Sequence, residues 1–457
     1  MAFEINKKDF LVISFVHFWL LPMYWLYGFS NNFVFAFTNY LIILISIIGL
    51  FYKSYWYFSI RKIFFLFNLL FFGLIPYFDN IFNKYYWGGA EIDIFFFNMS
   101  NIIIIISTVV YILIYSVFKP KLDIAHLVNK ENKIQSFFKN NNKKAILTLF
   151  GIAILSMVLI FYYRDWTFVN LFFRDLYPNS YSRINYVFVA FFITPIPIIS
   201  LVILRYILNI KPIISIKYRV IILIFGFLAI LFVFPTSVPR FLALALYLPL
   251  IISYTDILNK KYRIEFYSIF GLFFIMPFLD KFRYFSTYEN SQFNYNLSFL
   301  QAGHFDAYQN FVRLVSIDYV SYGEQLMGVL IFFIPSSWME GKPTGTGVLI
   351  GKLSNLDLQN IGMPLIAEGY ANFSILGSIV FIGLFAFLSK YFDSKYWTLR
   401  RYYDQHSFFT TYYLLLGLTI YILRGALMSS AAYSISILSI SLLIFFMLRK
   451  MVSMKIV

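Results

Sequence analysis

Two arginines at the ends of apolar segments are well suited to binding an anion. Arg240 follows the sequence PTSVP and begins an apolar run, and Arg424 ends another run in the sequence YILRGALMSS. A guanidinium stays charged at any physiological pH and presents paired donors to phosphate oxygens. Both arginines stand beside Pro, Gly or other small residues, where the backbone can approach a ligand. The pattern indicates binding of a lipid diphosphate, and snorkelling to lipid headgroups is the alternative.

Further polar groups gather in the segment QAGHFDAYQNFVRLV, residues 301–315. His304 is a candidate base for a hydroxyl group, or a hydrogen-bonding group that positions it, and a structural role is the alternative. Asp306 and Arg313 are seven residues apart, so a helix places them near the same face. Three apolar residues form a face that we expect to lie along a membrane surface: Phe305, Phe311 and Val312.

Two more segments combine charge with residues that interrupt regular structure. In IPSSWMEGKPTGTGVLIGKL, residues 334–353, Lys342 supplies a point charge and the Gly-rich turn offers amides for an anion nest; a plain structured loop is the alternative. The GxxxxGK[ST] pattern of nucleotide-binding loops is absent, so ATP use is not supported. In GMPLIAEGYANFSILGS, residues 362–378, Glu368 is a candidate buried acid or base, or a helix cap.

The elements that must position these residues are apolar helices. The chain has 457 residues, of which 60% are hydrophobic and 13% charged. Runs of about 18 or more apolar residues, enough to cross roughly 30 Å of hydrocarbon, recur along the chain. We predict an all-α polytopic integral membrane protein, a single transmembrane domain over residues 1–457 with about twelve helices (11 to 14). The expected spans are 10–29, 33–51, 63–78, 93–118, 145–163, 185–204, 220–235, 241–256, 265–279, 373–390, 408–424 and 431–448.

Charge and cysteine content narrow the class of function. The net charge of +16 is typical of Lys and Arg anchoring helix ends at the cytoplasmic side, so we expect no nucleic acid partner. Most of the 37 Lys and Arg residues lie in segments that face the cytoplasm if both termini are cytoplasmic. The chain has no cysteine and four scattered histidines, so we expect neither a thiol nucleophile nor a metal site, and no cofactor.

The connections between the expected spans are unequal in length. Residues 119–144 are rich in Lys and Asn and predict a solvated cytoplasmic linker. Residues 280–372 form one large outer region between the ninth and tenth spans. Within it, 326–337 is apolar but too short to span, which is typical of a re-entrant or interfacial segment.

Several sequence elements resemble one family of membrane enzymes. They are VPRFLALALYLPLI, in which an arginine starts a mid-chain span, and then HFDAY, IPSSWMEGKPTGTG and PLIAEGYANF in the large outer region. Together with the order of the spans, these elements resemble the O-antigen polymerase (Wzy) and oligosaccharide repeat-unit polymerase family. The motif similarity covers about residues 235–380.

The resemblance implies a metal-independent, inverting glycosyl transfer between undecaprenyl-diphosphate-linked glycans, in a fold like that of GT-C membrane glycosyltransferases. It implies the periplasmic face of a bacterial inner membrane, with membrane lipids and a chain-length regulator as further candidate partners. The roles expected from it are diphosphate binding for Arg240, Arg424, Arg313 and Lys342; acceptor activation for His304, Asp306 or Glu368; and sugar stacking for Tyr308, Trp338 and Tyr370.

Three other functions are compatible with the same span count. A lipid-linked oligosaccharide flippase would share the substrate, although it usually has two related halves, and no internal repeat is evident here. An O-antigen ligase is a close enzymatic relative that the sequence does not separate from a polymerase. A non-catalytic scaffold has little reason to keep arginines at several outer helix ends.

Overall fold

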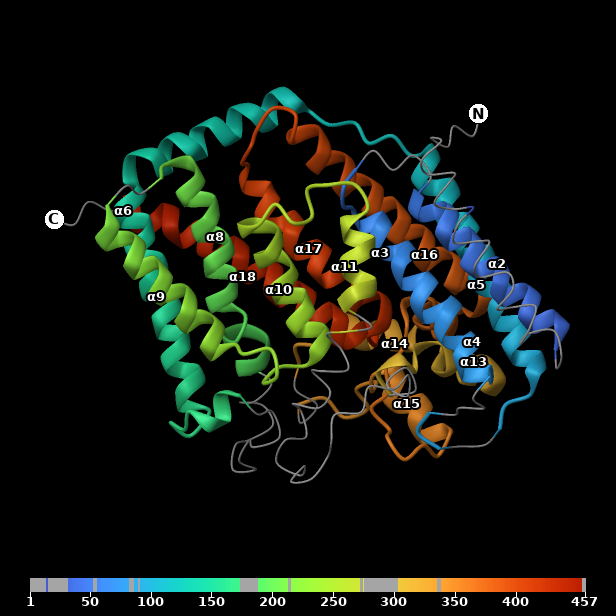
Figure 1. Ribbon diagram of the computed structural model, residues 1–457. Helices are drawn as coiled ribbons and strands as arrows, with labels where there is room; N and C mark the ends of the chain where they lie inside the picture. Colours follow the sequence, from blue (N-terminus) through green and yellow to red (C-terminus); the bar gives the residue numbers. More distant parts are fainter. Residues whose placement is uncertain are drawn as a thin grey trace.

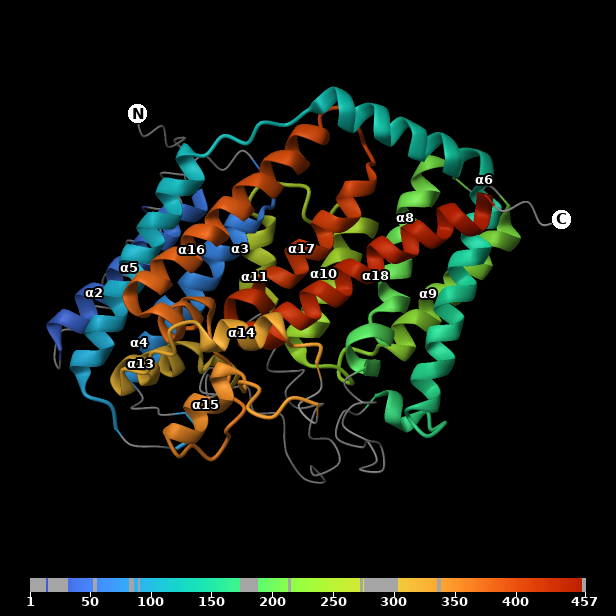
Figure 2. The same ribbon diagram turned by 180° about the vertical axis from the view of Figure 1, so that it is seen from behind.

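The computed structural model describes residues 14, 32–51, 56–81, 86–88, 91–172, 188–212, 215–271, 274, 303–334 and 338–453, without the side chains of Lys217, Tyr218, His304 and 451–453. Within these residues every regular element is helical (Figures 1 and 2). The elements are α2 (Phe33–Phe51), α3 (Ile60–Phe67), η1 (Asn68–Leu74), α4 (Ile75–Ile81), α5 (Ile94–Val117), α6 (Ile124–Tyr162), η2 (Val169–Leu171), η3 (Val189–Ile193), α8 (Ile196–Ile210), α9 (Ile216–Phe232), α10 (Arg240–Tyr254), α11 (Arg263–Phe270), η7 (Gly303–Phe305), α13 (Ala307–Ile317), α14 (Glu324–Leu330), α15 (Thr346–Leu353), α16 (Leu365–Leu399), α17 (Ser407–Arg424) and α18 (Leu427–Ser453).

The structure confirms the helical, multi-pass character of the chain. Eight helices among the described residues are long and apolar enough to cross a membrane, and two shorter apolar helices cover 219–232 and 240–254. The segment expected at 33–51 matches α2 at both ends, and η1 joins α3 and α4 into one continuous helical run over 60–81. The span expected at 10–29 lies outside the described residues except for Ser14, and most of 271–279 is likewise not described. The number twelve and the orientation remain predictions.

Two apolar clusters make up the core, and α10 and α17 contribute to both. One cluster packs α2 to α5 against α13 and α16, and the other packs α6, α8, α9 and α18. The helices α10 and α17 run antiparallel and approach closely, because a Cβ atom on Gly417 would lie 2.3 Å from the carbonyl oxygen of Ala245. The end of α17 and the start of α10 therefore lie together at one end of the bundle.

The first part of α6 was expected to be a linker, and the structure instead makes it helical from Ile124. It lies crosswise over one end of the bundle before α6 turns and runs along one side of it, next to α9 (Figure 1). The bend falls at Asn141, whose backbone (φ −118°, ψ 23°) is not helical. The hydrogen-bond partners of the first part of α6 come from α8, α17 and the turn before α17, so this segment belongs to the packed structure.

A sharp break divides α16 into a short first segment and a long second one. Phe373 and Ser374 are not helical, and the φ of Ser374 is 56°. The two segments cross where a Cβ on Gly369 would lie 2.4 Å from the carbonyl oxygen of Gly377, which only glycine permits. The expected span at 373–390 therefore begins at this break, and Glu368 lies in the short segment before it.

At the end of the bundle opposite the first part of α6, α13, α14 and α15 gather around the end of α17 (Figures 1 and 2). The expected surface helix over 301–315 is a buried helix, because Phe305, Phe311 and Val312 are fully enclosed by protein. Their apolar face packs on the core rather than on a membrane, so that expectation was wrong. Of the segment 326–337, α14 ends at Leu330 and 335–337 are not described.

Candidate functional site

An ion pair between Arg424 and Asp306 lies at the centre of the predicted site. The Nη2 atom of Arg424 donates to Oδ1 of Asp306 at 2.7 Å. The Asp306 side chain is buried, whereas 16% of the Arg424 side chain is exposed. The Arg424 side chain is therefore partly exposed at this end of the bundle, while its carboxylate partner is buried.

Two further groups hold the Arg424 guanidinium in place. Its Cζ atom lies 4.6 Å from the centre of the Phe241 ring, a cation–π contact across the α10–α17 pair. Gly362 lies on another side, where an added Cβ would come within 2.9 Å of Cζ. Because Phe241 follows Arg240 at the start of α10, the two arginines singled out in the sequence lie at the same end of the bundle.

Asp306 stands where an aspartate would normally cap its own helix. It occupies the N-cap position of α13, yet its side chain accepts no hydrogen bond from that helix. Its Oδ2 atom accepts instead from the indole Nε1 of Trp87 at 2.8 Å, and Oδ1 accepts from Arg424. Gly303 makes room for the indole, because a Cβ there would lie 1.9 Å from the ring. The Asp306 carboxylate therefore accepts hydrogen bonds from Arg424 and Trp87 and does not cap α13.

Arg313 lies deeper and is enclosed by backbone. Its Nη2 atom donates to the carbonyl oxygens of Tyr86 and Gly88, at 2.8 and 2.9 Å. Only 3% of Arg313 is exposed, so the side chain is buried among the described residues. These contacts hold the loop that carries Trp87, and the role of Arg313 in diphosphate binding stays a prediction.

A buried hydrogen-bond network supports the same loop. Asp79 accepts from the hydroxyl of Tyr86 at 2.9 Å and from the amide of Gln309 at 3.2 Å. The Gln309 amide oxygen in turn accepts from the backbone N–H of Tyr86 at 3.0 Å. Burial, with the Asp79 carboxylate beside it, raises the pKa of the Tyr86 hydroxyl, so it remains a donor.

Glu368 joins three elements and caps a helix other than its own. Its Oε1 atom accepts from the backbone N–H of Leu427, the first residue of α18, at 2.9 Å. Its Oε2 atom accepts from the hydroxyl of Thr346, the first residue of α15, at 2.8 Å. A carboxylate at a helix N-terminus is favoured by the helix dipole. Glu368 therefore positions the turn that links Arg424 to α18.

His304 and Lys342 are the two remaining polar residues predicted for the site. The backbone of His304 lies in η7, next to Asp306, and its side chain is outside the described residues. Lys342 donates to the carbonyl oxygens of Phe332 and Ile334 at 3.1 and 2.6 Å, which fixes the loop after α14. Burial lowers the pKa of Lys342 below its ordinary value. None of these contacts links Lys342 to Arg424.

Of the three aromatic residues expected to stack on sugars, only Trp338 is accessible. It is 80% exposed. The ring of Tyr308 is buried, and its hydroxyl donates to Asn101 Oδ1 at 2.7 Å; the buried Tyr370 donates to Asp318 Oδ1 at 3.0 Å. Both rings are buried in the core of this structure, and the stacking role expected for them stays a prediction.

Sequence reasoning missed Trp87, Asp79 and Gly362, which all contribute to the arrangement around Arg424. The YYWGGAE sequence, three aromatic residues followed by two glycines between two apolar runs, was the available signal for Trp87. No group of three or more His, Asp or Glu side chains able to hold a metal ion occurs among the residues that the structure describes. Comparison with protein-family models, curated proteins and solved structures finds no match to this chain.

Proposed function

We propose that this chain is a glycosyltransferase that joins undecaprenyl-diphosphate-linked oligosaccharide repeat units at the periplasmic face of a bacterial inner membrane. The observation that supports this most is Arg424, whose side chain is partly exposed and whose guanidinium is held among Asp306, Phe241 and Gly362 at one end of a membrane-spanning bundle. The resemblance of HFDAY, IPSSWMEGKPTGTG and PLIAEGYANF to repeat-unit polymerases supports the reaction class.

The proposed reaction needs cationic groups for its leaving group. An acceptor hydroxyl oxygen forms a bond to the anomeric carbon of the donor, the bond from that carbon to the diphosphate breaks, and undecaprenyl diphosphate leaves as the hydroxyl proton passes to a base. Arg424, with Arg240 at the start of α10, stabilises the charge that develops on the diphosphate. Fixed donors cost little reorganisation as that charge forms, which is why the Asp306 and Phe241 contacts matter.

The carboxylates have positioning roles in this proposal. Asp306 accepts from Arg424 and Trp87, and Glu368 accepts from Leu427 and Thr346, so both have their oxygens engaged. We assign acceptor activation to His304, which lies in η7 and precedes Asp306 by two residues in the chain. Trp338 is the accessible aromatic residue for a sugar face.

The first test is deletion of the gene in its host, with surface and lipid-linked glycans resolved by size. Long chains that collapse to a single repeat unit on the surface support a polymerase. Repeat units trapped on the cytoplasmic leaflet would make the protein a flippase, and complete glycan that is never attached to its final acceptor would make it a ligase. An unchanged size distribution would overturn the proposal.

Complementation with point variants then tests the site. Arg424→Lys keeps a positive charge but loses the fork of donors, and we expect chain extension to fall by about 100-fold, as for loss of a transition-state donor. Arg205→Gln is the control, because Arg205 likewise lies over an aromatic ring of α10, 5.5 Å from the centre of Tyr254, but at the other end of that helix, where it donates to the carbonyl oxygen of Ser253. Equal activity of both variants, at equal amounts in the membrane, would remove Arg424 from the mechanism.

A further inference from the structure

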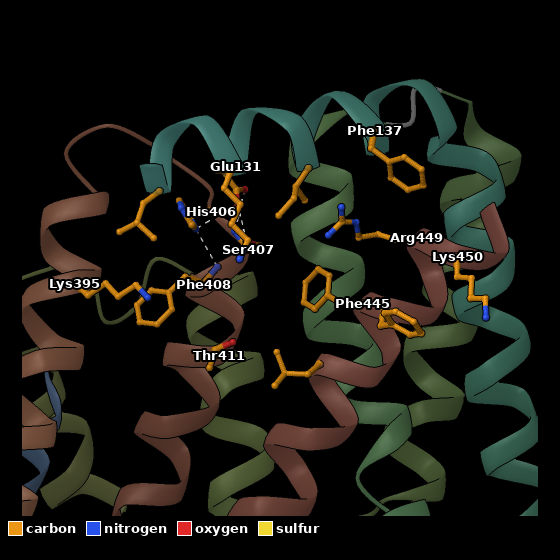
Figure 3. A pocket seen from close by; sticks show the side chains of 15 residues that line it. Glu131, Phe137, Lys395, His406, Ser407, Phe408, Thr411, Phe445, Arg449 and Lys450 are labelled. Carbon is orange, nitrogen blue, oxygen red and sulfur yellow. Dashed lines mark hydrogen bonds and ion pairs between the residues drawn. The ribbon is translucent and has the colours of Figure 1, made fainter. Parts of the chain in front are cut away.

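A cavity of about 860 Å³ lies at the opposite end of α17 from Arg424. The first part of α6 covers it, and the ends of α16 and α18 and the start of α17 form its walls (Figure 3). The 18 residues of α17 separate this cavity from the Arg424 site by about 27 Å, at 1.5 Å rise per residue. The two sites therefore belong to opposite faces of the bundle.

The charged side chains that line the cavity are mostly cationic. They are Lys130, Lys395, Arg449 and Lys450, with Glu131 as the one lining carboxylate within the described residues. Lys130 and Arg449 have no ion pair or side-chain hydrogen bond with any residue that the structure describes. Lys395 lies 4.3 Å from the centre of the Phe408 ring. Like charges around one space repel one another, and an anion that entered the cavity would relieve that repulsion.

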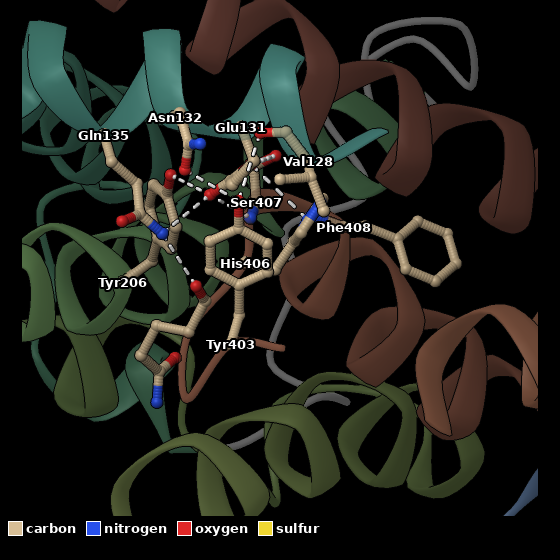
Figure 4. A network of polar contacts seen from close by, with 10 residues as sticks. Val128, Glu131, Asn132, Gln135, Tyr206, Tyr403, His406, Ser407 and Phe408 are labelled. Atoms are coloured by element: carbon tan, nitrogen blue, oxygen red, sulfur yellow. Dashed lines mark hydrogen bonds and ion pairs between the residues drawn. The ribbon is translucent and has the colours of Figure 1, made fainter. Parts of the chain in front are cut away.

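Glu131 can offset only one of these four positive charges, and hydrogen bonds hold it in the cavity wall (Figure 4). Its Oε1 atom accepts from the hydroxyl of Tyr206 at 2.7 Å and from the N–H of Ser407 at 3.0 Å, and Oε2 accepts from the hydroxyl of Ser407 at 2.6 Å. The residue is completely buried. Glu131 thus ties α6 to the start of α17, and the charge presented to the cavity is positive.

His406 adds a buried donor to the cavity wall. Its Nδ1 atom accepts from the N–H of Phe408 at 3.0 Å, which assigns the proton of the neutral ring to Nε2. The Nε2 atom is buried and has no hydrogen-bond partner among the described residues, and only 6% of the side chain is exposed. An unpaired buried donor costs free energy until an acceptor reaches it.

One wall of the cavity is apolar and continues onto the outside of the bundle. Leu442 and Phe446 line it from α18, and they are 62% and 61% exposed. In a membrane-spanning helix such residues face lipid chains. The cavity therefore joins a cationic head region to a surface that an acyl chain can follow.

We propose that this cavity binds an anionic phospholipid, with its phosphate among Lys130, Lys395 and Arg449 and an acyl chain along Leu442 and Phe446. Cations that line a space between helix ends suit an anionic headgroup, and the apolar wall distinguishes a lipid from a soluble anion. The occupied cavity would hold α6 against α17 and α18. The site is independent of the proposed glycosyl transfer, since it lies at the other end of the bundle.

The test is native mass spectrometry of the purified full chain titrated with phosphatidylglycerol, and with phosphatidylcholine of the same acyl chains. The variant Lys130→Gln/Arg449→Gln removes two cavity cations. The control Lys119→Gln/Lys139→Gln removes two exposed cations at the same end of the molecule but outside the cavity lining. Unchanged gel-filtration elution and unfolding temperature establish that each variant is folded.

We expect phosphatidylglycerol to bind the natural chain more tightly than phosphatidylcholine. The cavity variant should lose about tenfold in that affinity and the control variant less than about twofold, since cations near a lipid surface each contribute modestly. Equal binding of the two lipids, or an equal loss in both variants, would overturn the proposal. Displacement of bound phosphatidylglycerol by millimolar inorganic phosphate would also overturn it, because the site would then be one for a soluble anion.

Discussion

The Arg424–Asp306 ion pair predicts which of its two residues, when substituted, costs more of the free energy of unfolding. The substitution Arg424→Gln leaves Asp306, which is 1% exposed, without its cation, and we expect a loss of about 3–5 kcal/mol in the free energy of unfolding. The substitution Asp306→Asn leaves Arg424, which is 16% exposed and packed on Phe241, so the cost should be smaller, about 1.5–3 kcal/mol. Removing the arginine should therefore be the more harmful change.

A double-mutant cycle isolates the interaction itself. With both substitutions together, the loss should fall short of the sum of the single losses by about 2 kcal/mol, because the two groups are in direct contact. The measurement is denaturant unfolding of the purified protein in detergent micelles, followed by tryptophan fluorescence. Losses that add within about 0.5 kcal/mol, or a larger cost for Asp306→Asn than for Arg424→Gln, would refute the reasoning.

Three further predictions use other parts of the structure. Gly362→Ala should displace the Arg424 guanidinium and lower the initial rate of glycosyl transfer at least tenfold, whereas Gly345→Ala, with no atom within 4 Å of the new Cβ, should leave the rate unchanged. Burial lowers the pKa of His406 below its ordinary value of 6.5, more than Glu131 beside it raises it. The unfolded chain therefore binds a proton at His406 more tightly than the folded chain does, so the stability from this residue should be full above about pH 6.5 and fall as the pH decreases. The variant His406→Asn can still cap α17, and its unfolding temperature should fall less steeply with decreasing pH. An unchanged slope in the variant would contradict this prediction. Trp338→Ala should raise KM for the glycan substrate while the free energy of unfolding stays within about 0.5 kcal/mol, because the side chain is 80% exposed.

The helices could be predicted where hydropathy alone determines them. The segments expected at 33–51 and 93–118 match α2 and α5 to within a residue, since a long apolar run is a local signal. The first part of α6 was missed because its Lys and Asn content lowers the mean hydropathy. Its apolar residues Leu127, Ile134 and Phe138 nevertheless follow helical spacing, and that periodicity was the signal for an amphipathic helix.

The site could be predicted only in part, because its contacts join distant parts of the chain. Arg424 and Asp306 were both singled out from local sequence, but 118 positions separate them and nothing in either segment specifies the pairing. Trp87 is 219 positions from Asp306, and its role depends on how α13 packs. Local pattern likewise could not distinguish the exposed Trp338 from the buried Tyr308, since both are aromatic residues in a polar outer segment.

The central claim is that this chain alone extends lipid-linked glycans. The most direct test supplies the purified protein, in vesicles, with a labelled undecaprenyl-diphosphate-linked repeat unit and no other enzyme. We predict products of two and more units together with released undecaprenyl diphosphate, and loss of both in Arg424→Lys but not in Arg205→Gln. A single unit that stays unextended with a correctly inserted protein would contradict the account.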